Sequence, residues 1–203
     1  MSIGSTDTTT DKLTGDMNVK YPAVRKRLLK LMKEDQADRR PGKFWGGDPS
    51  KSDPECMVEW LRRDQTRADK LLLFLEFIKV PSVHNIGLDG SRAAWLIAQH
   101  NPDYRNLGPI MLRKMKYLFY KDKNQVYYQG IPYLVDRLML IRHNWQRTAR
   151  QLYGTQGYHD KQGQVRSYPI IDRKNLLNRL KKFDLDINAC IGLRGNTSNE
   201  RAA

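Results

Sequence analysis

One histidine stands at a point in the chain where its side chain could act on a substrate. His100 and Gln99 follow the apolar run of residues 95–98, so we expect the imidazole to lie at the rim of the core. There, partial burial or a carboxylate partner can tune an imidazole to work as a general acid or base. The alternative is a structural histidine whose charged form is favoured by the C-terminal end of its helix.

A second candidate is the charged pair Asp136 and Arg137, which interrupts an apolar stretch over residues 133–140. Charges in such a setting need partners, because burying an unpaired charge is costly. One interpretation is an ion-pair network that fixes helix packing. In the other, Asp136 orients or deprotonates a group and the forked guanidinium of Arg137 binds an anion.

A third candidate is the polar segment of residues 151–156, in which amide, phenol and hydroxyl side chains surround Gly154. Alternation of side chains predicts a strand here, and a glycine within a strand permits a bulge or the close approach of a ligand. The segment either supplies hydrogen bonds that orient a substrate or forms a polar edge strand. It contains no strong nucleophile.

Established catalytic and metal-binding motifs are absent from the sequence. We find no HExxH, Walker loop, GxSxG or GxGxxG, and no metal-ligand spacing joins His84, His143 and His159. Cys56 and Cys190 are isolated, so neither a zinc site nor a disulfide framework is expected. The sequence thus predicts no metal and no cofactor, and its cysteine usage fits a reducing cytoplasm.

Composition favours a single soluble domain. The 203 residues are 39% hydrophobic and 29% charged, enough for one core. No run approaches the roughly 18 apolar residues of a membrane span. We expect flexible polar tails over residues 1–19 and 194–203, and a globular domain over residues 20–193.

Charge suggests a different partner. The formal net charge of +14 attracts polyanions, although a lysine-rich surface can also serve solubility alone. Basic residues gather over residues 113–116, 142–150 and 173–182, and Tyr117, Tyr120 and Trp145 are available for base stacking. Nucleic acid is therefore a partner to test.

Hydrophobic periodicity predicts a mainly α fold, a helical bundle of about five to six helices with a small C-terminal β-hairpin. We expect helices over residues 21–39, 55–79, 91–100, 107–120, 126–142 and 173–182, and hairpin strands over residues 150–156 and 164–168. Ser91 is the expected N-cap of the third helix, and Asp172 that of the last. Acid–base spacings on the first two helices, such as Asp35 with Arg39 and Asp64 with Arg67, are typical of exposed helix pairs.

The order of these motifs resembles a bacterial family, domain-of-unknown-function family 6624. The resemblance covers residues 24–190 and rests on Trp-Leu-Ile-x-Gln-His, Leu-x-Asp-Arg and Gln-Leu-Tyr-Gly-Thr-Gln in this order. It implies a shared set of polar positions and no established reaction. The chain departs from the family pattern after His100, at residues 101–105. The positions carried over are Asp35, Gln36, Arg39, Asp64, Gln99, His100, Asp136, Arg137, Gln151, Tyr153, Gly154, Thr155 and Gln156.

Two functions follow from these observations. The first is a small hydrolase or transferase that acts on a polar or anionic small molecule. Its catalytic residues are His100 as general acid or base, Asp136, which orients His100, and Arg137, which holds an anionic group. The other is a non-catalytic domain that holds nucleic acid on its basic faces. The substrate-binding residues predicted for the enzyme are Asp35, Gln36, Arg39, Gln99, Gln151, Tyr153, Thr155 and Gln156.

Overall fold

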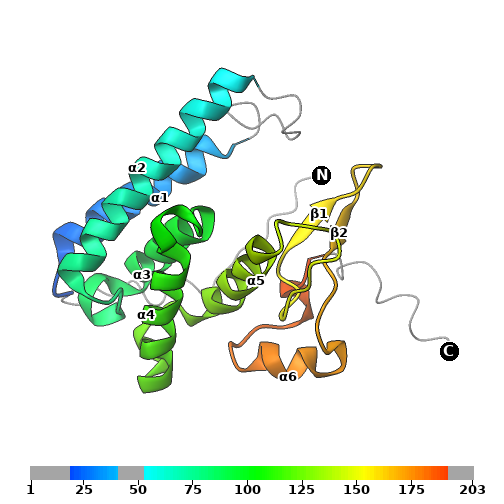
Figure 1. Cartoon of the computed structure of the whole chain (residues 1–203). Helices are drawn as coiled ribbons and strands as arrows, with labels where there is room; N and C mark the ends of the chain where they lie inside the picture. Colours follow the sequence, from blue (N-terminus) through cyan, green and yellow to red (C-terminus); the bar gives the residue numbers. More distant parts are fainter. Residues whose placement is uncertain (1–18, 41–52, 192–203) are drawn as a thin grey trace, which may run out of the picture.

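A computed structural model describes residues 19–40 and 53–191 of the chain (Figure 1). It confirms the predicted mainly α fold with a small C-terminal hairpin. The helices are α1 (Pro22–Asp38), α2 (Pro54–Ile78), α3 (Val83–His100), α4 (Leu107–Lys121), α5 (Ile131–Arg142) and α6 (Leu176–Lys181). The strands are β1 (Gly157–His159) and β2 (Val165–Ser167), paired antiparallel. Most of the predicted loop between the first two helices lies outside the described residues.

The helices α1 and α2 lie side by side, and α3 packs against both (Figure 1). The buried face of α1 runs from Val24 through Leu28 and Leu31, at helical spacing, and then continues with Asp35 and Asp38. On α2 the buried face is likewise apolar toward Ile78 and charged at Asp64 and Arg67. The interface between these two helices therefore changes from hydrophobic to ionic along its length.

The third helix begins earlier than the sequence predicted. Ser82, and not Ser91, caps it by accepting a hydrogen bond from the Asn85 backbone N–H. The residues expected to form a loop instead form the first turns, which bend at Gly87, where φ is 75°. Ser91 is buried, and its hydroxyl accepts the backbone N–H of Tyr127. The kink at Gly87 explains why no single helical period covered the whole element.

The predicted strand over residues 150–156 was wrong. The hairpin has only three residues in each strand, with Gly157 opposite Ser167, and the segment before it folds into a loop. Gly154 has a φ of 74°, a backbone conformation that favours glycine and ends any extended strand. Only Gln151 makes an isolated bridge, to Ile170.

Differences at two further helices are smaller. The fifth helix begins at Ile131 and follows two short 3₁₀ turns, Lys123–Gln125 and Tyr128–Gly130. In the C-terminal part, Arg173–Asn175 is a 3₁₀ turn, and Asp172 does not cap the helix that follows. In the described ranges, no helix is both long and apolar enough to cross a membrane.

Gly130 tests how tightly α3 packs against the start of α5. A Cβ added at Gly130 would lie 2.6 Å from two atoms of the Trp95 ring, whose Nε1 donates to the Gly130 carbonyl at 2.8 Å. We expect Gly130→Ala to lower the free energy of unfolding by roughly 1–3 kcal/mol, measured by urea denaturation. In a Trp95→Leu background the same substitution should cost less, and an equal cost in both backgrounds would contradict this packing.

Candidate functional site

An ionic cluster occupies the charged end of the α1–α2 interface. We use this name for Asp35, Asp38, Arg39, Arg63, Asp64 and Arg67. Arg67 donates to Asp38 at 2.7 Å and to Asp64 at 2.5 Å, and these side chains are at most 4% exposed. Arg39 joins the two helices by donating to Asp35 at 3.1 Å and to Asp64 at 2.7 Å. Among these six residues, carboxylates and guanidiniums are equal in number.

His100, the last residue of α3, extends from the rim of the core into this cluster. Its Nδ1 lies 2.8 Å from Asp35 Oδ2 and also 2.8 Å from Arg39 Nε. An ionised carboxylate can only accept, whereas Arg39 Nε has an acceptor of its own in Asp35 Oδ2 at 3.2 Å. The Arg39 Nε–H also points at Nδ1, but Nδ1 cannot both accept from Arg39 and donate to Asp35. We therefore assign the Nδ1 proton to the contact with Asp35, and the Arg39 Nε–H to Asp35 Oδ2. Nε2 carries the lone pair, and no hydrogen bond occupies it within residues 19–40 and 53–191.

Burial and charge set the protonation of this pair. Burial raises the pKa of Asp35. The hydrogen bond and charge of His100 and the charge of Arg39 lower it by more than burial raises it, so that the pKa is about 2. Burial, together with the positive charges of Arg39 and Arg137, lowers the pKa of His100, and the hydrogen bond and negative charge of Asp35 offset only part of this change. At neutral pH the pair is thus an ionised carboxylate and a neutral imidazole, the state of a general base.

The predicted pairing of Asp136 with His100 was wrong. The fully buried Asp136 accepts hydrogen bonds from the backbone N–H groups of Leu152, Tyr153 and Thr155 at 2.7–2.9 Å. It also accepts from the Thr155 hydroxyl at 2.8 Å. Burial raises the pKa of Asp136 above the usual range of a carboxyl, and these four donors offset only part of the rise. Asp136 therefore holds the loop of residues 151–156 in place.

Arg137 points in a different direction from Asp136 and contacts the end of the loop of residues 151–156. Its Nε donates to Gln156 Oε1 at 3.2 Å, and its guanidinium lies over the Trp145 ring at 5.5 Å. No carboxylate pairs with it in the part of the chain that the structure describes. Burial, with a contribution from the charge of Arg39, lowers the pKa of Arg137 to about 10, so it remains charged at neutral pH.

Three elements meet around His100 and Arg137. The side-chain amides of Gln99 and Gln156 both donate to the Tyr133 carbonyl at 3.4 Å, from α3 and from the loop. Tyr133 and Arg137 are four residues apart and share a face of α5. The positive charge of Arg137 also contributes to lowering the pKa of His100. The Tyr133 carbonyl therefore joins the amides of Gln99 and Gln156, which adjoin His100 along the chain and Arg137 through its hydrogen bond. We take these four residues, with Arg39 in contact with His100, as the candidate site.

Most of the other predicted substrate-binding residues are occupied structurally. The fully buried Gln151 amide donates to the carbonyls of Gln156 and Tyr168, and its oxygen accepts the Gln156 N–H. Thr155 donates to Asp136, and the Tyr153 ring packs edge-on against Phe183. The exposed Gln36 donates to Asp35 at 2.9 Å. Asp35 and Arg39 lie in the site and orient His100.

Sequence reasoning missed Asp38, and it wrongly placed the pairs Asp35–Arg39 and Asp64–Arg67 on the surface. A usable signal existed, because Asp35 and Asp38 continue the helical spacing of Leu28 and Leu31 on the buried face. As to metals, residues 19–40 and 53–191 contain no group of three His, Cys, Asp or Glu side chains placed to hold one.

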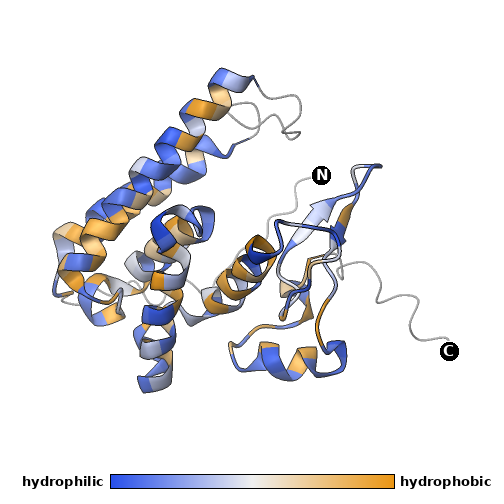
Figure 2. Cartoon of the chain, in the orientation of Figure 1, coloured by the Kyte–Doolittle hydropathy of each residue, from blue (hydrophilic) through white to orange (hydrophobic). Residues whose placement is uncertain are grey.

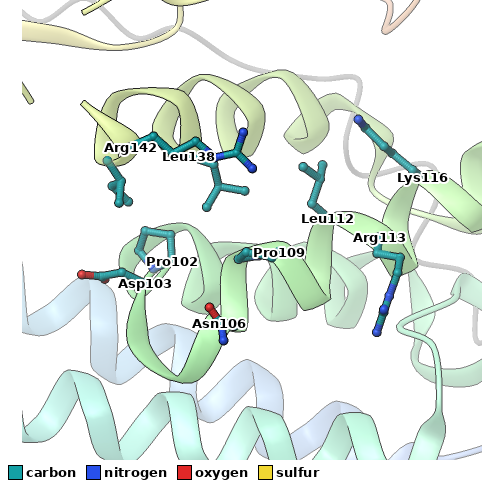
Figure 3. Close-up of a pocket in the computed structure, with 10 residues that line it drawn as sticks. Pro102, Asp103, Asn106, Pro109, Leu112, Arg113, Lys116, Leu138 and Arg142 are labelled. Carbon is teal, nitrogen blue, oxygen red and sulfur yellow. The ribbon is translucent and has the colours of Figure 1, made fainter. Parts of the chain in front are cut away.

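A surface groove of about 610 Å³ lies apart from this site, between α4 and α5 (Figure 3). Its apolar lining includes Leu112 and Leu138, and Arg113, Lys116 and Arg142 surround it. None of the predicted site residues lines it. Figure 2 shows α5 as largely hydrophobic. Its charged residues are Asp136 and Arg137 and, in the last turn, Arg142.

Comparisons with protein-family models, with curated proteins and with solved structures found no match to this chain. The resemblance to family 6624 stays a prediction. The geometry of the site therefore carries the functional argument by itself.

The role of Asp136 can be tested through the loop that it holds. Asp136→Asn replaces a carboxylate that accepts from four donors with a group that has one acceptor oxygen, so we expect a loss of roughly 3 kcal/mol in unfolding free energy. Hydrogen exchange at the amides of Leu152, Tyr153 and Thr155 should accelerate. Thr155→Val removes one donor and should cost about 1 kcal/mol. An Asp136→Asn protein as stable as Thr155→Val would refute the assignment.

Proposed function

We propose that this protein is a small enzyme in which His100 acts as general base, oriented by Asp35. The observation that carries the proposal is the 2.8 Å contact of Nδ1 with the buried Asp35 carboxylate, which leaves Nε2 available. A buried carboxylate that fixes the tautomer of a histidine also stabilises the imidazolium formed during proton transfer. The ionic cluster holds Asp35 in place through Arg39.

The reaction class that suits these groups is hydrolysis or transfer to a hydroxyl. His100 Nε2 takes a proton from water or an alcohol, and the freed oxygen bonds to a phosphorus or carbonyl carbon while the bond to the leaving oxygen breaks. Protonated His100 then returns its proton to the leaving oxygen. The step balances with water or a hydroxyl compound as the only co-reactant.

The surrounding groups favour a polar or anionic small molecule as substrate. Gln156 is held by both Arg137 and the Tyr133 carbonyl, so its position is defined before a substrate arrives. The 5% exposed Gln99 has a side-chain oxygen that accepts no hydrogen bond within the described residues. Unsatisfied polar groups of this kind are uncommon and call for a functional or structural explanation.

We further propose membership of family 6624 and a cytoplasmic location.

One observation favours the second function, nucleic-acid binding. The basic residues Arg113, Lys116 and Arg142, from two of the three basic stretches, meet around the groove between α4 and α5. Two basic residues of these stretches are less available. Lys114 donates to the Lys79 carbonyl, and Arg179 donates to the carbonyls of Leu152 and Ile171. Other basic residues, among them Arg173, Lys174, Lys181 and Lys182, are exposed outside this groove.

The enzyme hypothesis is tested by a turnover screen over phosphate monoesters and carboxylic esters. For any substrate found, we expect His100→Ala to lower kcat about 10²–10⁴-fold while circular dichroism stays unchanged. His143→Ala, which removes an exposed histidine, is the matched control and should keep full activity. Turnover that survives His100→Ala would reject the proposal.

The pH dependence of that turnover tests the role of Asp35. Because burial lowers the pKa of His100, kcat/KM should rise with pH and reach its plateau below the usual histidine range. The negative charge of Asp35 raises that pKa, so Asp35→Asn should move the rise to still lower pH and reduce kcat. An unchanged profile in Asp35→Asn would show that Asp35 does not act through His100.

A further inference from the structure

The guanidinium of Arg137 differs from those of the ionic cluster in having no carboxylate among the described residues. Arg39 and Arg67 each donate to two aspartates. Arg137 donates only from Nε, to Gln156 Oε1, among the described residues, and the Trp145 ring lies against the face of its guanidinium. Its two Nη groups make no hydrogen bond within the described residues. These two groups form the edge of the fork that matches an oxyanion.

The residue before Arg137 is a carboxylate, Asp136, but among the described residues the two form no ion pair. Asp136 directs its oxygens to four donors of the loop of residues 151–156. Consecutive residues on a helix point in different directions, so the two charges do not meet. Arg39 and Arg67 already hold Asp35 and Asp64, so among the described residues no carboxylate compensates the positive charge of Arg137.

We propose that Arg137 is the oxyanion-binding residue of the site, and that its Nη groups hold a phosphate or carboxylate group of the substrate beside His100. The Gln156 contact and the Trp145 ring fix the plane of the guanidinium before the anion arrives. This inference deepens the proposed function and rests on it only for the role of His100. It makes an anionic substrate, and not merely a polar one, the expectation.

A bound anion should be visible at His100. The charged groups around the imidazole are Asp35 and Arg39 from α1, with Asp64 from α2 behind Arg39, and Arg137 from α5. An anion on Arg137 offsets the positive charge that disfavours the imidazolium. The pKa of His100 should therefore rise when the anion binds.

The experiment is an NMR pH titration of the histidine ring protons in the full-length protein, with inorganic phosphate in one arm and acetate in another. Sodium chloride at matched ionic strength is the reference, and the exposed His84, His143 and His159 are internal controls. We expect a rise of about 0.5 or more in the pKa of His100 with at least one anion, and no comparable change at the other histidines. The arm that gives the larger change identifies phosphate or carboxylate as the group recognised.

Variants assign the effect to Arg137. Arg137→Gln should weaken anion binding at least tenfold and abolish the shift. Arg27→Gln, an equal loss of charge at an exposed position of α1, should leave it in place. If Arg137→Gln fails to fold, Arg137→Lys keeps the charge without the fork and should weaken binding several-fold. No shift with either anion in the wild type, or an undiminished shift in the Arg137 variants, would overturn the inference. A shift without His100-dependent turnover would overturn only the proposed function.

Discussion

The structure depends on pairing the charges that α1 and α2 bury between them. Asp35 and Asp38 are fully buried, and removing one partner of a buried ion pair typically costs about 3–5 kcal/mol. Arg67 and Arg39 satisfy these carboxylates from α2 and from the end of α1. Replacing buried ion pairs by well-packed apolar side chains is often neutral for stability, so packing alone does not explain the charges. The ionic interface also places the ionised carboxylate of Asp35 at the end of α3, where it contacts His100.

The same constraint explains the loop of residues 151–156. Asp136 interrupts an apolar helix, and its burial is offset by N–H and hydroxyl donors that only a folded-back loop can provide. Gly154, with its positive φ, allows the chain to turn there. Because the loop is held in this way, Gln156 reaches Arg137. Two buried acids thus position the two sides of the site, Asp35 at His100 and Asp136 at Arg137.

Much of the fold could be predicted from the sequence because helical periodicity is a local signal. Residues 22–38 and 54–78 repeat apolar side chains at three- and four-residue spacing, and both helices lie within one residue of their expected ends. The bend at Gly87 and the loop after Arg150 could not, since each is stabilised by contacts with residues distant in the chain. The Arg25–Asp89 pair beside the bend joins residues 64 apart, and Asp136 meets the loop 16–19 residues on.

The residues of the candidate site could likewise be predicted only in part from the sequence. His100 and Arg137 stood out because their charges or titrating groups adjoin apolar runs, whereas the partner of His100 could not be read from spacing. Asp136 is a nearer acid in the sequence than Asp35, but only the packing of α1 against α3 decides between them.

The most direct test of the account is the tautomer of His100, read from the ¹⁵N chemical shifts of its ring nitrogens near neutral pH. We predict a neutral ring with the proton on Nδ1 and an unprotonated Nε2, and loss of that preference in Asp35→Asn. A proton on Nε2, or a ring that stays charged at neutral pH, would contradict the assignment of His100 as a general base held by Asp35.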